Sequence, residues 1–111
     1  MNTFGHTVAE HGDHVRLALI GDVDFAAHPT LIAQLTTLVG VGRAVVVDCS
    51  AVTFLDSMGL RALVEGRRAA QIAGVGFELA DLSRPVLRVI ELSGTTELFT
   101  IRGPITEEYG P

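Results

Sequence analysis

The sequence predicts a single α/β domain with a mixed, mostly parallel sheet, in the element order β-β-α-β-α-β-α-β. Three observations support this prediction. Apolar strand-like runs alternate with helical patterns after the second strand, which is typical of parallel strands joined through helices. The length of 111 residues suits one domain, and the apolar share of 48% is sufficient for a core. Because Trp is absent and aromatic residues are few, that core should be aliphatic.

The first half of the chain passes from alternating residues to a helical period. Residues 7–11 are expected to form a short edge strand, followed by a Gly-Asp turn. Apolar and other residues alternate over 15–20, which predicts a second strand. A helix is expected over 26–39, where apolar residues recur at three-to-four spacing. Pro29 fits only the first turn of that helix.

The middle of the chain predicts a buried strand and a long helix. Residues 44–49 form a β-branched run without alternation, which indicates a central strand covered on both faces. Residues 50–55 are expected to form a loop. A helix should begin at Asp56 or Ser57 and continue to about Ala73, with glycines closing it.

The last third should complete the sheet. A strand is expected over 76–80, and a helix should begin at Ser83 as its N-cap and end near residue 93. A short strand is expected over 98–101. The ordered core should therefore span about residues 7–102, and the Pro- and Gly-containing tail over 103–111 should be loose.

Composition excludes several classes of function. The formal net charge is −5 and every cation is Arg, so no basic stripe is available for direct nucleic-acid binding. A protein partner with a basic face fits better. The single cysteine, Cys49, lies in an apolar run and is expected to be a buried, inert thiol in a reduced cytosol. No apolar run approaches the roughly 20 residues of a membrane span, so we expect a cytoplasmic protein.

Known catalytic and metal patterns are missing. The histidines at positions 6, 11, 14 and 28 lack a Cys or carboxylate at the spacing of a tetrahedral site. The chain contains neither a Gly-x-Ser-x-Gly elbow nor a P-loop. We therefore expect a protein that is not an enzyme and that holds no cofactor or metal.

Two short segments at predicted strand ends resemble a known family. Gly21-Asp22-Val23-Asp24 ends the second strand, and Phe54-Leu55-Asp56-Ser57-Met58-Gly59-Leu60 precedes the long helix. In position and spacing they resemble the motifs of the anti-sigma factor antagonist family of STAS domains. Residues 89–94 resemble the family's late helix and its glycine end. The resemblance covers roughly residues 8–101 and implies a single STAS-type domain within residues 1–111.

The resemblance implies a switch between protein partners. Members of the family bind a serine kinase that is itself an anti-sigma factor, and this binding releases a sigma factor. Phosphorylation of the serine in the Asp-Ser pair ends the binding, and a separate phosphatase restores it. By position the acceptor is Ser57 and its acidic partner is Asp24. Asp56, Met58 and Gly59 complete the expected partner-binding set.

The residues themselves leave alternatives open. Asp56 could cap the second helix or order the Ser57 hydroxyl, and Asp24 could cap the first helix or face the kinase. Met58 could form a contact surface or pack under a loop. Gly59 could allow close approach of a partner or of the sheet. Asp22 is interpreted as a solvated turn residue.

Two positions depart from the family pattern. Many relatives carry a hydroxyl residue where this chain has Ala27, so a cap of the first helix is lost. Met58 is larger than the usual residue beside the acceptor. These departures bear on which kinase is recognised.

The helix start suits a phosphate. The first N–H groups of a helix have no partner within the helix and tolerate an anion, so phosphate on Ser57 should leave the fold intact. Alternative functions are a STAS subunit of a lipid or solute transport complex and a scaffold of a stress assembly. A neighbouring gene for a serine kinase or for transporter subunits discriminates between these functions. The oligomeric state is not predicted.

Overall fold

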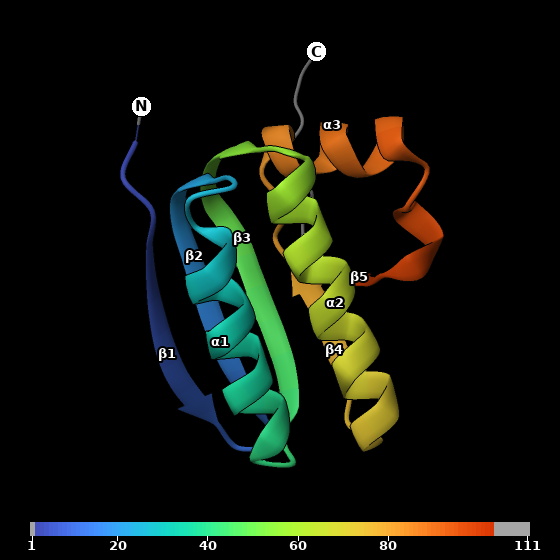
Figure 1. Cartoon of the computed structure of the whole chain (residues 1–111). Coiled ribbons are helices and arrows are strands. Elements are labelled where there is room, and N and C mark those ends of the chain that lie inside the picture. Colours follow the sequence, from blue (N-terminus) through green and yellow to red (C-terminus); the bar gives the residue numbers. More distant parts are fainter. Residues whose placement is uncertain (1, 104–111) are drawn as a thin grey trace.

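Strands form one continuous sheet through the described part of the chain. The computed structural model describes residues 2–103. Within them the sheet has five strands in the order β1-β2-β3-β4-β5. Only β1 runs antiparallel to its neighbour, so the predicted mixed sheet with an N-terminal edge strand is confirmed (Figure 1). The strands are β1 Gly5–His11, β2 His14–Val23, β3 Ala44–Leu55, β4 Phe77–Ala80 and β5 Thr100–Arg102.

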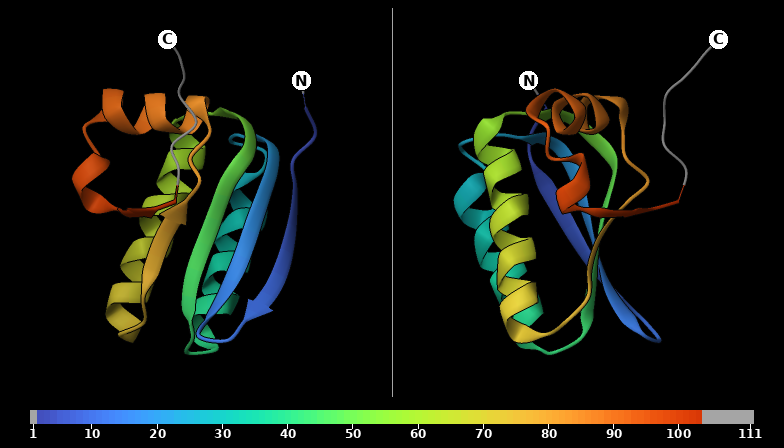
Figure 2. Two further views of the ribbon diagram at one scale, coloured as in Figure 1. Left: turned by 180° about the vertical axis from the view of Figure 1, so that it is seen from behind. Right: turned by 90° about the vertical axis from the view of Figure 1, so that its right-hand side faces the viewer.

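The helices cover one face and one end of this sheet. Helices α1 (His28–Gly40) and α2 (Ser57–Ala73) lie side by side over the same face. Helix α3 (Arg84–Ser93) lies across the end at which α2 begins, and a 3-10 turn, η1 (Thr96–Leu98), leads to β5. Views from behind and from the side show the sheet as a layer with α1 and α2 on one side only (Figure 2).

The core is aliphatic, as predicted, and lies between the sheet and the two long helices. Its fully buried members include Leu17, Leu35, Leu63 and Leu79 from four different elements. Gly66 lets α1 and α2 approach closely, because a Cβ at this position would lie 2.6 Å from the Leu35 Cδ1 atom. Burial of such side chains is the main favourable term in folding.

The predicted loop over residues 50–55 is wrong. Strand β3 continues through this segment to Leu55 and stays paired with β2. The pairing register shifts twice, between the partners of Ala18 and Ile20 and between those of Gly21 and Asp22. Each shift places an extra β3 residue opposite β2, as in a β-bulge. Bulges break the alternation of side chains, which explains why the segment does not read as a strand from its sequence.

Several element ends differ by a few residues from the prediction. Helix α1 starts at His28, and Ala27 at its N-cap makes no side-chain cap bond, as the missing hydroxyl predicts. Ser83 occupies the N-cap position of α3, but its hydroxyl makes no cap bond. The final strand is Thr100–Arg102 because η1 takes up residues 96–98. The predicted tail lies outside the described residues from position 104 onward.

Cys49 is fully buried in β3, as expected for an inert thiol. Burial raises the pKa of its thiol to about 12, so almost no thiolate exists near neutral pH. We predict that a thiol reagent at pH 8 labels the native protein only as fast as the core opens. In denaturant the unfolded protein should be labelled immediately, with one reagent molecule per chain. Immediate labelling of the native protein would contradict the burial of this side chain.

Candidate functional site

The two sequence motifs meet at one edge of the sheet. The last residues of β2 and β3, Val23 and Leu55, are paired neighbours in parallel strands. The next residue, Asp56, donates its backbone N–H to the Val23 carbonyl oxygen at 3.3 Å. Both motifs therefore lie together at the same end of the sheet. This edge joins the loop over residues 24–27 to the start of α2.

The carboxylate of Asp56 connects these two segments. Its Oδ1 atom accepts hydrogen bonds from the backbone N–H groups of Met58 and Gly59, each at 2.9 Å. Its Oδ2 atom accepts a bond from the N–H of Phe25 in the preceding loop at 3.1 Å. Asp56 is therefore the N-cap of α2 and also ties the first motif to the second. This geometry favours the capping role over ordering of the Ser57 hydroxyl.

Gly59 is required for packing inside the domain. Its position is buried, and a Cβ there would lie 2.2 Å from the Val23 carbonyl oxygen. The backbone of α2 can therefore rest against the end of β2 only if this residue has no side chain. Of the two alternatives for Gly59, the structure supports close approach to the sheet.

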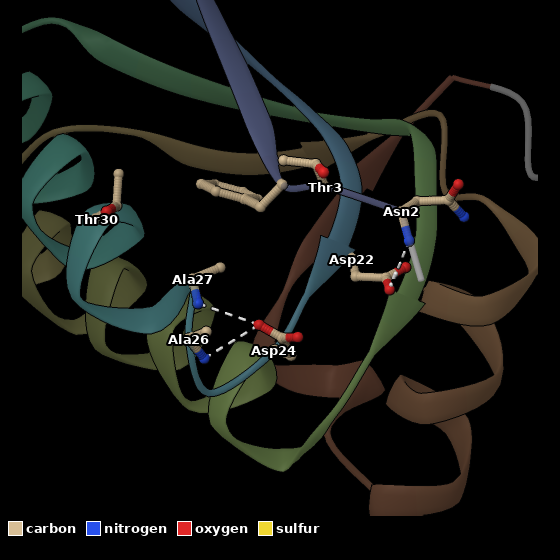
Figure 3. A pocket seen from close by; sticks show the side chains of 8 residues that line it. Asn2, Thr3, Asp22, Asp24, Ala26, Ala27 and Thr30 are labelled. Atoms are coloured by element: carbon tan, nitrogen blue, oxygen red, sulfur yellow. Dashed lines mark hydrogen bonds between the residues drawn. The ribbon is translucent and has the colours of Figure 1, made fainter.

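Asp24 organises the turn that leads into α1. Its Oδ1 atom accepts bonds from the N–H groups of Ala26 and Ala27, both at 3.1 Å, as drawn in Figure 3. Its backbone carbonyl accepts the N–H of His28 at 3.0 Å. Asp24 thus satisfies amides near the start of α1, where Ala27 provides no cap. Its Oδ2 atom has no hydrogen-bond partner among residues 2–103 and is available to a partner.

Asp22 is not a solvated turn residue, so that interpretation is wrong. Its side chain is buried, with only 6% of the residue exposed. One carboxylate oxygen accepts the Thr53 hydroxyl at 2.8 Å, and the other accepts the Asn2 N–H at 3.1 Å. Figure 3 shows the link to Asn2. Asp22 therefore anchors the N-terminal segment and the bulged end of β3.

Gly21 makes this anchoring possible. Its φ of +83° is a conformation that favours glycine, and a Cβ there would lie 2.1 Å from the Thr3 carbonyl oxygen. The N-terminal segment, Asp24 and the start of α1 then enclose an open pocket of about 330 Å³ (Figure 3). Ser57 is not among the residues that line this pocket.

Ser57 is the first residue of α2, and it is exposed. Its hydroxyl makes no hydrogen bond with any residue between 2 and 103, so it is free to react. Met58 beside it is partly exposed. Two further exposed apolar residues adjoin the aspartates of the two motifs and were not predicted as functional, namely Phe25, which is 71% exposed, and Phe54, which is 45% exposed.

The charges near Ser57 differ from the expectation for a helix start. Two of the N–H groups that were expected to receive a phosphate already bond to Asp56. The nearest cation along α2, Arg61, pairs with Glu65 at 3.2 Å. A phosphate on Ser57 would therefore add its charge beside a carboxylate that occupies the helix end.

Other chemistries find little support in the described residues. Over positions 2–103 no group of three or more His, Cys, Asp or Glu side chains is placed to hold a metal ion. His11 and His14 stack on each other with ring centroids 5.0 Å apart. No helix in this part of the chain is both long and apolar enough to cross a membrane.

Comparisons with known proteins agree with this arrangement. The sequence profile described as "Mlab, STAS domain" matches residues 6–101. An anti-sigma factor antagonist from Mycobacterium paratuberculosis superposes with a TM-score of 0.80 at 27% identity, covering 89% of this chain and 85% of that one. The unphosphorylated antagonist SpoIIAA gives a TM-score of 0.75 at 18% identity, covering 92% and 90%. The phosphorylated form of SpoIIAA, a Bacillus cell fate determinant, gives 0.71 at 17% identity, covering 92% and 93%.

We predict that Gly59→Ala destabilises the domain by about 1–3 kcal/mol, because the new methyl group overlaps a backbone carbonyl that cannot move aside freely. Gly40→Ala is the matched control, because it lies in α1 with open space around its Cβ position. It should be neutral or stabilise by up to about 1 kcal/mol. Urea unfolding of both variants measures the difference. Equal stability of the two variants would contradict this role of Gly59.

Proposed function

The chain belongs to the STAS domain family, and on that premise we propose that it is an anti-sigma factor antagonist that works as a phospho-switch. In its unphosphorylated form it binds an anti-sigma factor that is also a serine kinase, and the sigma factor is released. Phosphorylation of Ser57 ends this binding. A phosphoserine phosphatase restores the active form. The protein regulates transcription in the cytoplasm through protein partners, without contacting nucleic acid and without being an enzyme itself.

The observation that carries the proposal is the state of Ser57. Its hydroxyl is exposed at the first position of α2 and makes no bond with residues 2–103. The surrounding segments are fixed by Asp56, so the acceptor is presented from a rigid helix end. A pre-organised acceptor reduces the ordering that a kinase must impose. A structural neighbour with the same fold, SpoIIAA, has been solved in phosphorylated and unphosphorylated forms.

The transfer step requires only a kinase and ATP. The Ser57 Oγ atom attacks the γ-phosphorus of ATP, and a new O–P bond forms as the bond to the bridging oxygen of ADP breaks. ADP leaves with the bonding electrons, and the hydroxyl proton passes to a base of the kinase. The phosphatase later hydrolyses the ester with water and regenerates the hydroxyl.

The phosphate acts on the partner through charge and bulk. It adds about −1.5 to −2 charge near neutral pH. Because Asp56 already holds the N–H groups of Met58 and Gly59, the helix end has few donors left to balance this charge. An unmatched charge at the centre of an interface costs several kcal/mol, and about 2.7 kcal/mol already weakens binding roughly 100-fold.

The decisive experiment is phosphorylation by a defined kinase. We predict that one of the anti-sigma-type serine kinases encoded in the same genome adds a single phosphate to the pure protein, measured as intact mass. Ser57→Ala should abolish this increment, while its circular dichroism stays unchanged because the hydroxyl makes no internal bond. Thr53 is the built-in control. It is exposed and lies close to the acceptor in the sequence, but its hydroxyl bonds to Asp22.

Phosphate on Thr53 or Ser50 in place of Ser57 would reject the assignment. If none of these kinases adds a phosphate, and if neighbouring genes encode transporter subunits, the alternative of a transport-complex subunit is favoured.

A second prediction separates two roles of Asp24. Asp24→Asn keeps an Oδ1 atom that can accept the N–H groups of Ala26 and Ala27, so the melting temperature should change by less than about 2 °C. It removes the charge of a partly exposed carboxylate, so binding of the kinase should weaken several-fold. Isothermal titration with the kinase and a thermal melt measure the two effects. A fall of several degrees with normal binding would assign Asp24 to capping alone.

A further inference from the structure

Two of the five Phe residues of this chain are exposed and belong to segments that adjoin the start of α2. Phe4, Phe77 and Phe99 pack against the core, whereas Phe25 and Phe54 are 71% and 45% exposed. Burial of a Phe ring is favourable, so two exposed rings in a chain with so few aromatic residues require an explanation. Their positions relative to the acceptor provide one.

Both rings extend from backbone that is fixed next to the acceptor. The N–H of Phe25 and the N–H of Met58 bond to the same carboxylate, that of Asp56. This shared partner places the loop of Phe25 directly beside the start of α2. Phe54 lies in β3, two residues before Asp56, and its backbone is paired with Asp22. The backbone of Phe25, Phe54 and Met58 therefore lies close to that of Ser57, in the loop, the strand and the helix respectively.

Resting on the proposed function, we propose that Phe25 and Phe54 are the apolar anchors by which the unphosphorylated protein docks on its anti-sigma kinase. Aromatic side chains dominate the binding energy of many interfaces, particularly when they fill pockets of the partner. Because the backbone of both residues is held by hydrogen bonds, little ordering is needed on binding. Met58 adds an adaptable contact between them.

The charges beside the anchors define the partner surface. Asp24 is partly exposed and its Oδ2 atom has no hydrogen-bond partner among residues 2–103, which together with the net charge of −5 favours basic residues around the partner's apolar pocket. The partner is thus the kinase, and the surface that receives the two Phe rings is an apolar pocket with a basic rim. A phosphate on Ser57 would add its charge next to the segments that carry the anchors, where it opposes the desolvation that buried aromatic rings require.

The test uses the kinase that phosphorylates Ser57, with ADP present so that no phosphate is transferred. Phe25→Ser and Phe54→Thr should each raise the Kd of the unphosphorylated protein about 10-fold or more, at low and at high salt. The effect of Asp24→Asn should shrink as salt rises, because exposed charges are screened. Ile72→Ser is the matched control, because Ile72 is 80% exposed on α2 but lies about 22 Å along the helix axis from Ser57. It should leave the Kd within about 2-fold.

The outcomes separate this proposal from the function on which it rests. If Ser57 is phosphorylated but both Phe variants bind like the wild type, the anchor proposal is wrong and the switch stands. If no kinase binds the protein or modifies Ser57, both proposals fail. Should Phe54→Thr lower the melting temperature, Phe25→Ser alone decides, because Phe25 lies in the loop between β2 and α1. Equal weakening by Ile72→Ser would also reject the assignment to this surface.

Discussion

The three hydrogen bonds accepted by the Asp56 carboxylate are the interaction on which the site depends. They cap α2, fix the loop after β2 and join two segments that lie 31 residues apart in the chain. The backbone makes the same connection independently, because Asp56 donates its N–H to Val23 and Gly59 lies against the same carbonyl. A side chain with one acceptor oxygen could not satisfy both segments equally well. Rigid presentation of Ser57 follows from this one residue.

The same interaction also explains how the proposed switch can be sharp without rearrangement. A helix start with free N–H groups would absorb much of the charge of a phosphate. Here Asp56 has already taken the groups of Met58 and Gly59, so the added charge stays on the surface, where a partner meets it. The cap therefore stabilises the helix and leaves the modification uncompensated. In the proposed switch, fold stability and sensitivity to phosphate would both arise from this one carboxylate.

The fold was predictable from sequence wherever local patterns agree with the tertiary structure. Buried β-branched residues over 44–49 and the glycine ends of the helices indicated the element order, and both motifs were recognised at predicted strand ends. The bulged half of β3 was not predictable, since its register is set by β2. Nor was the burial of Asp22, whose partners Thr53 and Asn2 lie 31 and 20 residues away. Phe25 and Phe54 offered a signal that the prediction did not use, since Phe25 directly follows Asp24 and Phe54 begins the second motif.

The link between Asn2 and Asp22 has a consequence for how the protein is handled. Asn2 lies at the rim of the pocket that contains Asp24, at the end of the sheet where α2 begins with Ser57. Any fusion partner, affinity tag or surface linker joined ahead of Asn2 would emerge at this rim. It would obstruct the partner binding that is proposed for this end of the sheet, and it would strain the hydrogen bond from Asn2 to the buried Asp22 carboxylate. Immobilisation through an engineered cysteine at the opposite end of α2 keeps this edge open.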